Sequence, residues 1–148
     1  MTTIALAKLD YLRQTAQKLK EAGHGQKGAV VVSSCQFLSI SKAELYRQLE
    51  SDLLLVPAAF TYTTGLAHWE VLLRARAIEN LAFVVASAQG GKHPNGRRTY
   101  GNSMIINPWG DILNSLQEGE GMVIADCHAG VISERRRQLP ALSHRVLI

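Results

Sequence analysis

Three short apolar runs, set among segments of different periodicity, constrain the fold of this 148-residue chain more than any other feature. The runs are Leu53 to Val56, Ala82 to Ala86 and Ser103 to Ile106. Each is shorter than an ordinary helix and rich in aliphatic residues, which is typical of a strand buried in a sheet. We expect Pro57 to end the first run, because proline cannot donate a hydrogen bond to a neighbouring strand.

A helical pattern from His68 to Asn80 lies between the first two runs. Glu70 and Arg74 are spaced for an ion pair one turn apart on that helix. The helix is apolar over most of its circumference, so we expect it to be buried with Arg74, Arg76 and Glu79 paired. Such a helix would brace the sheet against a neighbouring element or form part of a subunit interface.

The first third of the chain contains further helix and strand signals. Residues Ala5 to Ala22 carry leucines at spacings of three and four, which predicts an amphipathic helix. Gly28 to Val32 follows as a short apolar strand. Ser41 precedes Glu44 by three residues, the spacing of a capping box that begins another helix.

Hairpin-linked strands dominate the second half. Ser103 to Ile106 is expected to pair with Ile112 and Leu113 across the turn Asn107 to Asp111. We expect Gly90 to Gly96 to be a loop and Met122 to Ala125 to be a last strand. Helices that alternate with strands early and hairpins that come late predict an α/β fold with a mixed sheet. With no linker or repeat, residues 1–148 are expected to form a single domain.

Composition excludes several classes of function. The net charge of +4 is mild, and the arginine clusters at 97–98 and 135–137 contain no aromatic residue, so we expect no nucleic-acid partner. No apolar run is long enough to span a membrane, and the N-terminus lacks the features of a signal peptide. The two cysteines form neither a CxxC pair nor a disulfide framework, which favours a cytoplasmic setting.

A series of local sequences in one order carries a more specific signal. These are Glu44-Leu45-Tyr46-Arg47, Leu55-Val56-Pro57-Ala58-Ala59-Phe60, Thr64-Gly65-Leu66-Ala67-His68-Trp69-Glu70, Leu73 to Asn80, Ala88-Gln89-Gly90, Tyr100-Gly101-Asn102-Ser103, Asn107-Pro108-Trp109-Gly110 and Arg137-Gln138-Leu139-Pro140. Together they resemble the nitrilase superfamily of carbon–nitrogen hydrolases, closest to the branch that includes deaminated glutathione amidase. The resemblance covers residues 44–148, while residues 1–43 diverge.

The resemblance implies an α-β-β-α sandwich, of which this chain would hold an incomplete domain. It also implies an amidase in which a cysteine thiolate attacks the amide carbon, a glutamate acts as general base and a lysine stabilises the tetrahedral intermediate. In the family the glutamate and lysine come from the first half of a domain about twice as long, and neither is found here. No cofactor is implied.

The cysteine motif departs from the family pattern. That pattern, approximately Cys-Tyr-Asp-Leu-Arg-Phe-Pro-Glu, places its cysteine where this chain has Phe37, and the aspartate, arginine and proline of the motif are absent. Cys35 lies two positions earlier, after an apolar strand, and is the candidate nucleophile. The alternative is a small buried thiol, which is favoured because no base accompanies Cys35.

Substrate contacts are expected in the loop from Phe60 to Gly65, because loops at the carboxyl ends of buried strands commonly hold ligands in α/β folds. Thr61, Thr63 and His68 are the candidate substrate-binding residues. Lys92 and His93 lie in a glycine-rich loop that is interpreted as solvated, with a place at the substrate mouth as the alternative.

Other chemical groups give weaker signals. Cys127 and His128 are neighbours whose side chains would point to opposite faces of a strand, so we interpret them as a chance pair. The segment Gly91 to Thr99 lacks the features of a nucleotide-binding loop. The five histidines show no metal-binding spacing, so no metal is expected; they are His24, His68, His93, His128 and His144.

Two functions follow from these observations. The first is a cytoplasmic amidase that hydrolyses a small carboxylate-bearing amide through a cysteine thioester. The second is a truncated, catalytically inactive nitrilase-like protein that acts as an interaction module or persists as a remnant. A separate chain could also supply the missing glutamate and lysine. Because half a sandwich exposes apolar surface, we expect a homo-oligomer or a complex with such a complementing chain.

Overall fold

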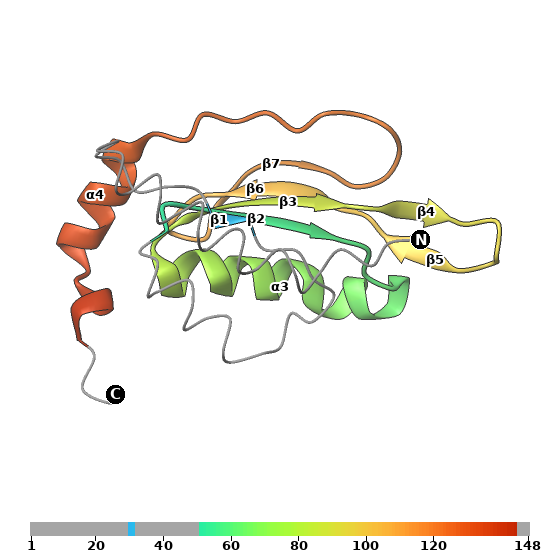
Figure 1. Ribbon diagram of the computed structural model, residues 1–148, viewed down its shortest axis with the longest axis horizontal. Helices are drawn as coiled ribbons and strands as arrows, with labels where there is room; N and C mark the ends of the chain where they lie inside the picture. The colour runs from blue at the N-terminus through green and yellow to red at the C-terminus, as the bar shows by residue number, and fades with distance from the viewer. Residues whose placement is uncertain (1–29, 32–50, 145–148) are drawn as a thin grey trace.

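The computed structural model describes residues 30–31 and 51–144, and these form a mixed sheet with one long helix against a face (Figure 1). The sheet has five strands in the order β1-β2-β3-β6-β7. Its strands are β1 (Val30–Val31), β2 (Leu53–Ala58), β3 (Phe83–Ala88), β6 (Ser103–Ile106) and β7 (Ile112–Leu116). The first three strands run parallel, whereas β6 and β7 are antiparallel to their neighbours. The α/β fold with a mixed sheet is thus confirmed.

The remaining elements lie around this sheet. The helix α3 (Tyr62–Asn80) connects β2 to β3, and the short strands β4 (Gly90–Lys92) and β5 (Arg98–Tyr100) form a separate two-stranded sheet. The helix α4 (Ala129–Gln138) follows β7 after a segment without regular structure, and the 3-10 helix η1 (Ala141–Ser143) comes next. No helix in the described ranges is long and apolar enough to cross a membrane.

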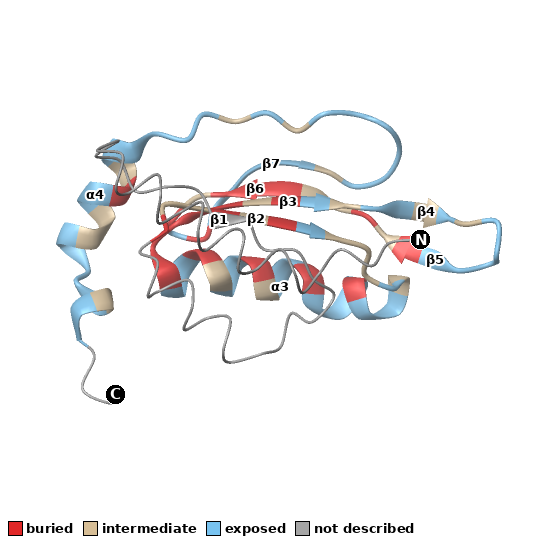
Figure 2. Cartoon of the chain, viewed as in Figure 1, coloured by how far each residue is buried: buried red, intermediate tan, exposed pale blue. Residues whose placement is uncertain are grey.

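The core lies between α3 and one face of the sheet. Alternate residues of β2 and β3, among them Leu54 and Val84, point to α3 and are fully buried. On the helix, Trp69, Leu73 and Ala77 recur every four residues and are also fully buried. Figure 2 shows this buried stripe along the side of α3 that faces the strands. The alternate residues of the strands and every fourth residue of the helix therefore pack into one apolar layer.

The helix is buried on one face only, so the expectation of burial around most of its circumference was wrong. Leu66 and Val71 are 64% and 66% exposed. The expected ion pair between Arg74 and Glu70 is confirmed at 3.3 Å, and Arg74 also donates to the Gly110 carbonyl at 2.9 Å. Arg76 pairs with Glu79, as expected. Among the described residues of α3, the apolar side chains of Leu66, Val71 and Ile78 are exposed.

The helix also begins earlier than expected. Thr61 keeps an extended backbone and its carbonyl accepts from the Gly65 N–H at 2.8 Å, so the first turn of α3 starts at Tyr62. The segment expected as a loop up to Gly65 is therefore mostly helical. Tertiary packing explains the glycine, because Tyr100 fills the space where a side chain at position 65 would lie.

Two strand assignments differ from expectation. The strand β2 continues through Pro57 to Ala58, where it is paired with β3; β1 pairs only with Leu54 and Leu55 in the described part of the chain. Proline is tolerated there because it interrupts no ladder to a second described strand. Of the segment expected as a loop, Gly90 to Lys92 form β4, whereas His93 to Gly96 lie in the turn that joins β4 to β5.

The C-terminal part contains one confirmed and one wrong expectation. The strand at Ser103–Ile106 pairs with β7 across the turn at 107–111, as expected. Met122 to Ala125 form no strand, and Met122 and Ile124 are 86% and 71% exposed. An apolar run forms a strand only where a neighbouring strand accepts its hydrogen bonds. Among the described residues, the segment is instead contacted by the Asn114 side chain, which donates to the Ile124 carbonyl at 2.9 Å. The helix α4, which the sequence did not indicate, follows it.

Several expectations fall outside the described residues. These are the helix at 5–22, most of the strand at 28–32, the helix after Ser41 and the position of Cys35. Within the expected strand, Val30 and Val31 form β1.

Candidate active site

The carboxyl ends of β2 and β3 lie side by side at one edge of the sheet. The register pairs Ala58 with Ala88, and the Gln89 N–H donates to the Ala58 carbonyl at 2.9 Å. The helix α3 begins four residues after β2 ends, so its N-terminus lies at the same edge. In α/β proteins this edge, beyond the carboxyl ends of parallel strands, is the usual place of a ligand site.

The β4–β5 hairpin is bonded to this edge through its backbone. Thr61 forms an antiparallel bridge with Thr99, and the Tyr100 N–H donates to the Phe60 carbonyl at 3.0 Å. The Gly101 N–H donates to the Gln89 carbonyl at 3.1 Å. The hairpin thereby forms a wall beside the strand ends.

Aromatic side chains fill the space between this wall and α3. The Tyr62 and Tyr100 rings meet edge to face at 5.9 Å, and the Phe60 and Trp69 rings lie 5.1 Å apart. The indole N–H of Trp69 donates to the Asn102 carbonyl at 2.7 Å. Packing and hydrogen bonding therefore hold the edge in a fixed shape.

The structure separates the three candidate substrate-binding residues. Thr61 lies directly at the edge, where its hydroxyl donates to Thr64 Oγ1 at 2.9 Å. Thr63 is exposed in the first turn of α3. His68 is also exposed but lies six residues into the helix, roughly 9 Å along its axis from Tyr62. Two of the three residues thus lie near the strand ends.

The bonding of His68 defines its proton arrangement. Its Nδ1 lies 3.1 Å from the Thr64 carbonyl oxygen. A carbonyl oxygen only accepts, so Nδ1 donates its proton in this hydrogen bond.

Sequence reasoning missed Thr99 at this edge. Thr99 is 1% exposed, and its hydroxyl lies 2.8 Å from His93 Nε2. His93 lies in the turn between β4 and β5, and this contact holds its ring against Thr99 of β5. The available signal was the alternation in Arg98, Thr99 and Tyr100, which places Thr99 on the face opposite its neighbours.

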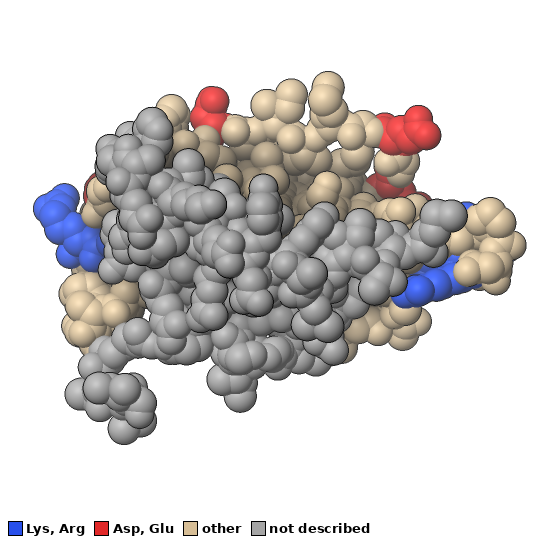
Figure 3. Space-filling view, viewed as in Figure 1, with Lys and Arg blue, Asp and Glu red and all other residues tan. Residues whose placement is uncertain are grey.

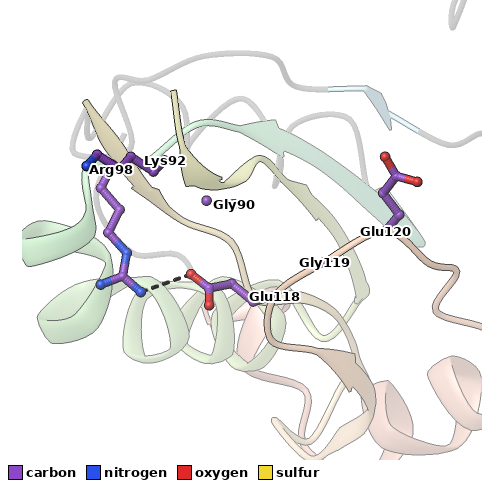
Figure 4. A pocket seen from close by; sticks show the side chains of 7 residues that line it. Gly90, Lys92, Arg98, Glu118, Gly119 and Glu120 are labelled. Carbon is purple, nitrogen blue, oxygen red and sulfur yellow. Dashed lines mark hydrogen bonds and ion pairs between the residues drawn. The ribbon is translucent and has the colours of Figure 1, made fainter. Parts of the chain in front are cut away.

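A groove of about 590 Å³ opens beside the hairpin (Figure 4). It is lined by Gly90, Gly91, Lys92, Arg98, Glu118, Gly119 and Glu120. Arg98 donates to Glu118 at 3.0 Å and stacks over the Tyr62 ring at 3.7 Å. The hydrogen bond to Glu118 is the main reason that the pKa of Arg98 lies above its ordinary value. Basic and acidic side chains thus share one end of the molecule (Figure 3).

Of the two cysteines, Cys127 lies in the described part of the chain, and Cys35 lies outside it. Cys127 is exposed and precedes His128, the residue before α4. Desolvation of the thiol and, second, the charge of Asp126 raise the pKa of Cys127. The described residues contain no group of three or more histidine, cysteine, aspartate or glutamate side chains placed to hold a metal ion.

Comparison with known proteins assigns most of the described residues to one protein family. Residues 40–137 match the family model for carbon-nitrogen hydrolase. Over 108 residues the chain is 50% identical to deaminated glutathione amidase of Synechocystis, an alignment that covers 71% of this chain and 40% of that protein. The human deaminated glutathione amidase is 42% identical over 121 residues, covering 82% and 36% respectively.

Solved structures show the same arrangement. The NitFhit protein of Caenorhabditis elegans aligns with a TM-score of 0.73 at 40% identity, over 80% of this chain and 28% of that one. Nit3 of Saccharomyces cerevisiae, a member of branch 10 of the nitrilase superfamily, also aligns with a TM-score of 0.73, at 26% identity, over 80% and 44%. The chain spans about 40% or less of the length of the curated relatives described above.

Proposed function

The chain belongs to the carbon–nitrogen hydrolase family, and on this premise we propose that it is an amidase acting on a small carboxylate-bearing amide. The observation that supports this proposal is the convergence, within the matched segment, of the β2 and β3 carboxyl ends with the N-terminus of α3. The β4–β5 hairpin closes one side of that edge. The name of the relatives from Synechocystis and human, deaminated glutathione amidase, supports the same chemistry.

The proposed nucleophile is Cys35. It follows Val31 by four residues, and β1 is parallel to β2, so the chain leaves β1 toward the same edge. The sulfur would attack the amide carbon, and collapse of the tetrahedral intermediate would expel ammonia and leave a thioester. Water would then hydrolyse the thioester to the acid and restore the thiol. Thr61, Thr63 and His68 are the proposed substrate contacts.

The N-terminus of α3 supports a reaction that develops negative charge. Its first turn has no side-chain cap and no acidic residue. The unsatisfied N–H groups of such a turn give a positive potential, which favours the charge that develops on the amide oxygen during attack. The glutamate base and the lysine implied by the family resemblance are not found in this sequence, so in this chain the proposed reaction depends on Cys35 and on these N–H groups.

The test measures ammonia release from a panel of small amides with and without a carboxylate. We expect release by the unmodified protein and a loss of roughly 100-fold or more in Cys35→Ala, because the thioester cannot form. Cys127→Ala is the matched control and should retain the rate. Mass spectrometry after treatment with iodoacetamide reports which cysteine the amide protects. The proposal fails if no amide releases ammonia, or if Cys35→Ala releases it at the unmodified rate.

The broken cysteine motif favours a second candidate, a catalytically inactive interaction module. Phe37 stands where the family pattern has its cysteine, and a displacement of two residues moves a side chain by several ångströms (roughly 3.3 Å per residue). For this candidate, circular dichroism shows a folded chain while every amide in the panel stays intact.

We also propose that residues 1–148 form a single, incomplete domain that associates with further copies of itself or with a complementing chain in the cytoplasm. Exposed apolar side chains support association: Leu66 and Val71 on α3, and Met122 and Ile124 after β7. Uncovered apolar residues on two sides of a small chain are typical of contact surfaces.

A further inference from the structure

We propose that the groove beside the β4–β5 hairpin is a binding site for the carboxylate end of a peptide-like amide, with Lys92 as its principal cation. The groove is open, and none of its seven lining residues is among the proposed catalytic or substrate-binding positions. The inference rests on the proposed amidase function for its role in catalysis. Binding itself is measurable without turnover.

The positions of two cations in the hairpin carry the argument. Lys92 and Arg98 are directly opposite each other in the β4–β5 pair, so both side chains project from the same face. Like charges in this arrangement repel, and one carboxylate, Glu118, offsets Arg98 at 3.0 Å. Arg98 is further fixed by stacking on Tyr62. Within the described residues Lys92 has no hydrogen-bond or ion-pair partner. A carboxylate of the ligand would therefore form an ion pair with Lys92, as Glu118 does with Arg98.

The shape of the groove indicates the size of the ligand. A volume of about 590 Å³ lies in the range of roughly 300–1,000 Å³ typical of small-molecule sites. A Cβ added at Gly91 or Gly119 would meet no atom within 4 Å, so the space beside these two lining residues is open to the main chain of a ligand. The groove therefore has room for a molecule of the size of a dipeptide.

The far end of the groove indicates what accompanies the carboxylate. Figure 4 shows Glu120 at the end opposite Lys92 and Arg98, and Glu120 has no ion-pair partner in the described part of the chain. A carboxylate accepts hydrogen bonds only, so this end favours N–H donors such as those of a peptide bond or an ammonium group. The two ends together are complementary to a peptide-like molecule.

The groove also lies next to the candidate active site. Gly90 comes two residues after the last residue of β3, and Arg98 stacks on Tyr62, the first residue of α3. A ligand held by its carboxylate at Lys92 would therefore reach the edge where β2 and β3 end. The groove would select amides that carry a carboxylate remote from the scissile bond.

The test uses NMR titration of the full chain with N-acetylglycylglycine and with its neutral C-terminal amide. We expect the carboxylate probe to shift the amide resonances of Gly90, Gly91 and Lys92, and the neutral probe to bind roughly three- to tenfold more weakly. Lys92→Met should weaken the carboxylate probe by a similar factor, and Lys92→Arg should restore it. Arg97→Met is the matched control, because Arg97 lies on the same hairpin outside the groove and its loss removes the same charge.

Equal affinity for both probes would overturn the inference, as would a carboxylate affinity that Lys92→Met leaves unchanged. A loss in Arg97→Met equal to that in Lys92→Met would also overturn it, since net charge alone would then explain binding. Ammonia release is scored separately. If the groove binds the carboxylate probe selectively but no amide releases ammonia, the amidase function is contradicted and the groove assignment stands. If amides release ammonia but the groove shows no selective binding, the groove assignment is contradicted and the amidase function stands.

Discussion

At the scale of single residues, Gly65 is a position where α3 and the hairpin approach closely. Tyr100 Cβ and ring atoms occupy the place of a Cβ at this position. We expect Gly65→Ala to destabilise the protein by about 1–3 kcal/mol, because either the ring or the helix must shift in a packed region. Urea unfolding followed by circular dichroism measures the change.

Gly130 provides the control for this substitution. It lies in α4, and an added Cβ would meet no atom within 4 Å. Gly130→Ala should be neutral or stabilise by roughly 0.5–1 kcal/mol, because alanine loses less backbone entropy in a helix. Equal effects of the two substitutions would contradict the close approach at Tyr100.

Cys127 gives a second prediction at this scale. Its raised pKa means that, at a given pH, a smaller fraction is thiolate than in an ordinary exposed cysteine. Alkylation by iodoacetamide should therefore be slow at neutral pH and should increase up to a pH above the ordinary thiol pKa. Asp126→Asn should lower that pKa and shift the profile toward lower pH. Mass spectrometry of the labelled peptide measures the rate, and a rate that is already maximal at pH 7 would refute the assignment.

At the scale of elements, a part-buried ion pair joins α4 to the start of β2. Arg136 donates to Asp52 at 2.8 Å and to the Ser51 carbonyl at 2.8 Å, and its side chain is 18% exposed. We expect Arg136→Met to cost roughly 1–3 kcal/mol, since the substitution leaves a carboxylate and a carbonyl without their donor. Thermal unfolding measures the loss.

Arg137 is the matched control for the α4 contact. It is exposed and adjacent in sequence, and it lies on a different side of the helix from Arg136. Arg137→Met should change stability by less than about 0.5 kcal/mol. If both substitutions have the same effect, overall charge rather than the contact with Asp52 holds α4 in place.

At the scale of the whole molecule, the apolar side of α3 predicts association. Val71 is 66% exposed, although the sequence around it is that of a buried helix. Light scattering coupled to size-exclusion chromatography should show a species heavier than one chain. Val71→Glu should shift the distribution toward monomer, because a carboxylate in an apolar interface would be desolvated without a partner.

Ser133→Glu, an exposed change on α4, is the control for this experiment. It adds the same charge away from α3 and should leave the mass unchanged. A monodisperse monomer that binds no dye specific for exposed apolar surface would contradict both the association and the incomplete-domain proposal.

Much of the fold follows from local pattern. The apolar runs at β2, β3 and β6 indicate buried strands, because strands in a sheet that is covered by a helix are rich in aliphatic residues. The short turn after Ile106 indicates that β6 pairs with β7. The α3 pair between Glu70 and Arg74 follows from helical spacing alone. For the same reason the family could be identified from ordered local sequences.

Other features depend on contacts between distant residues, which no local pattern contains. The start of α3 at Tyr62 depends on Tyr100, which packs against Gly65 from 35 positions away in the sequence. The β4–β5 hairpin is bonded to Phe60 through Tyr100, and Met122 to Ala125 stay irregular because no strand in the described part of the chain pairs with them. The sequence alone thus determined β2, α3, β3, β6 and the family, whereas tertiary structure decided where these elements begin and end, whether the later segments pair, and which charges share the groove.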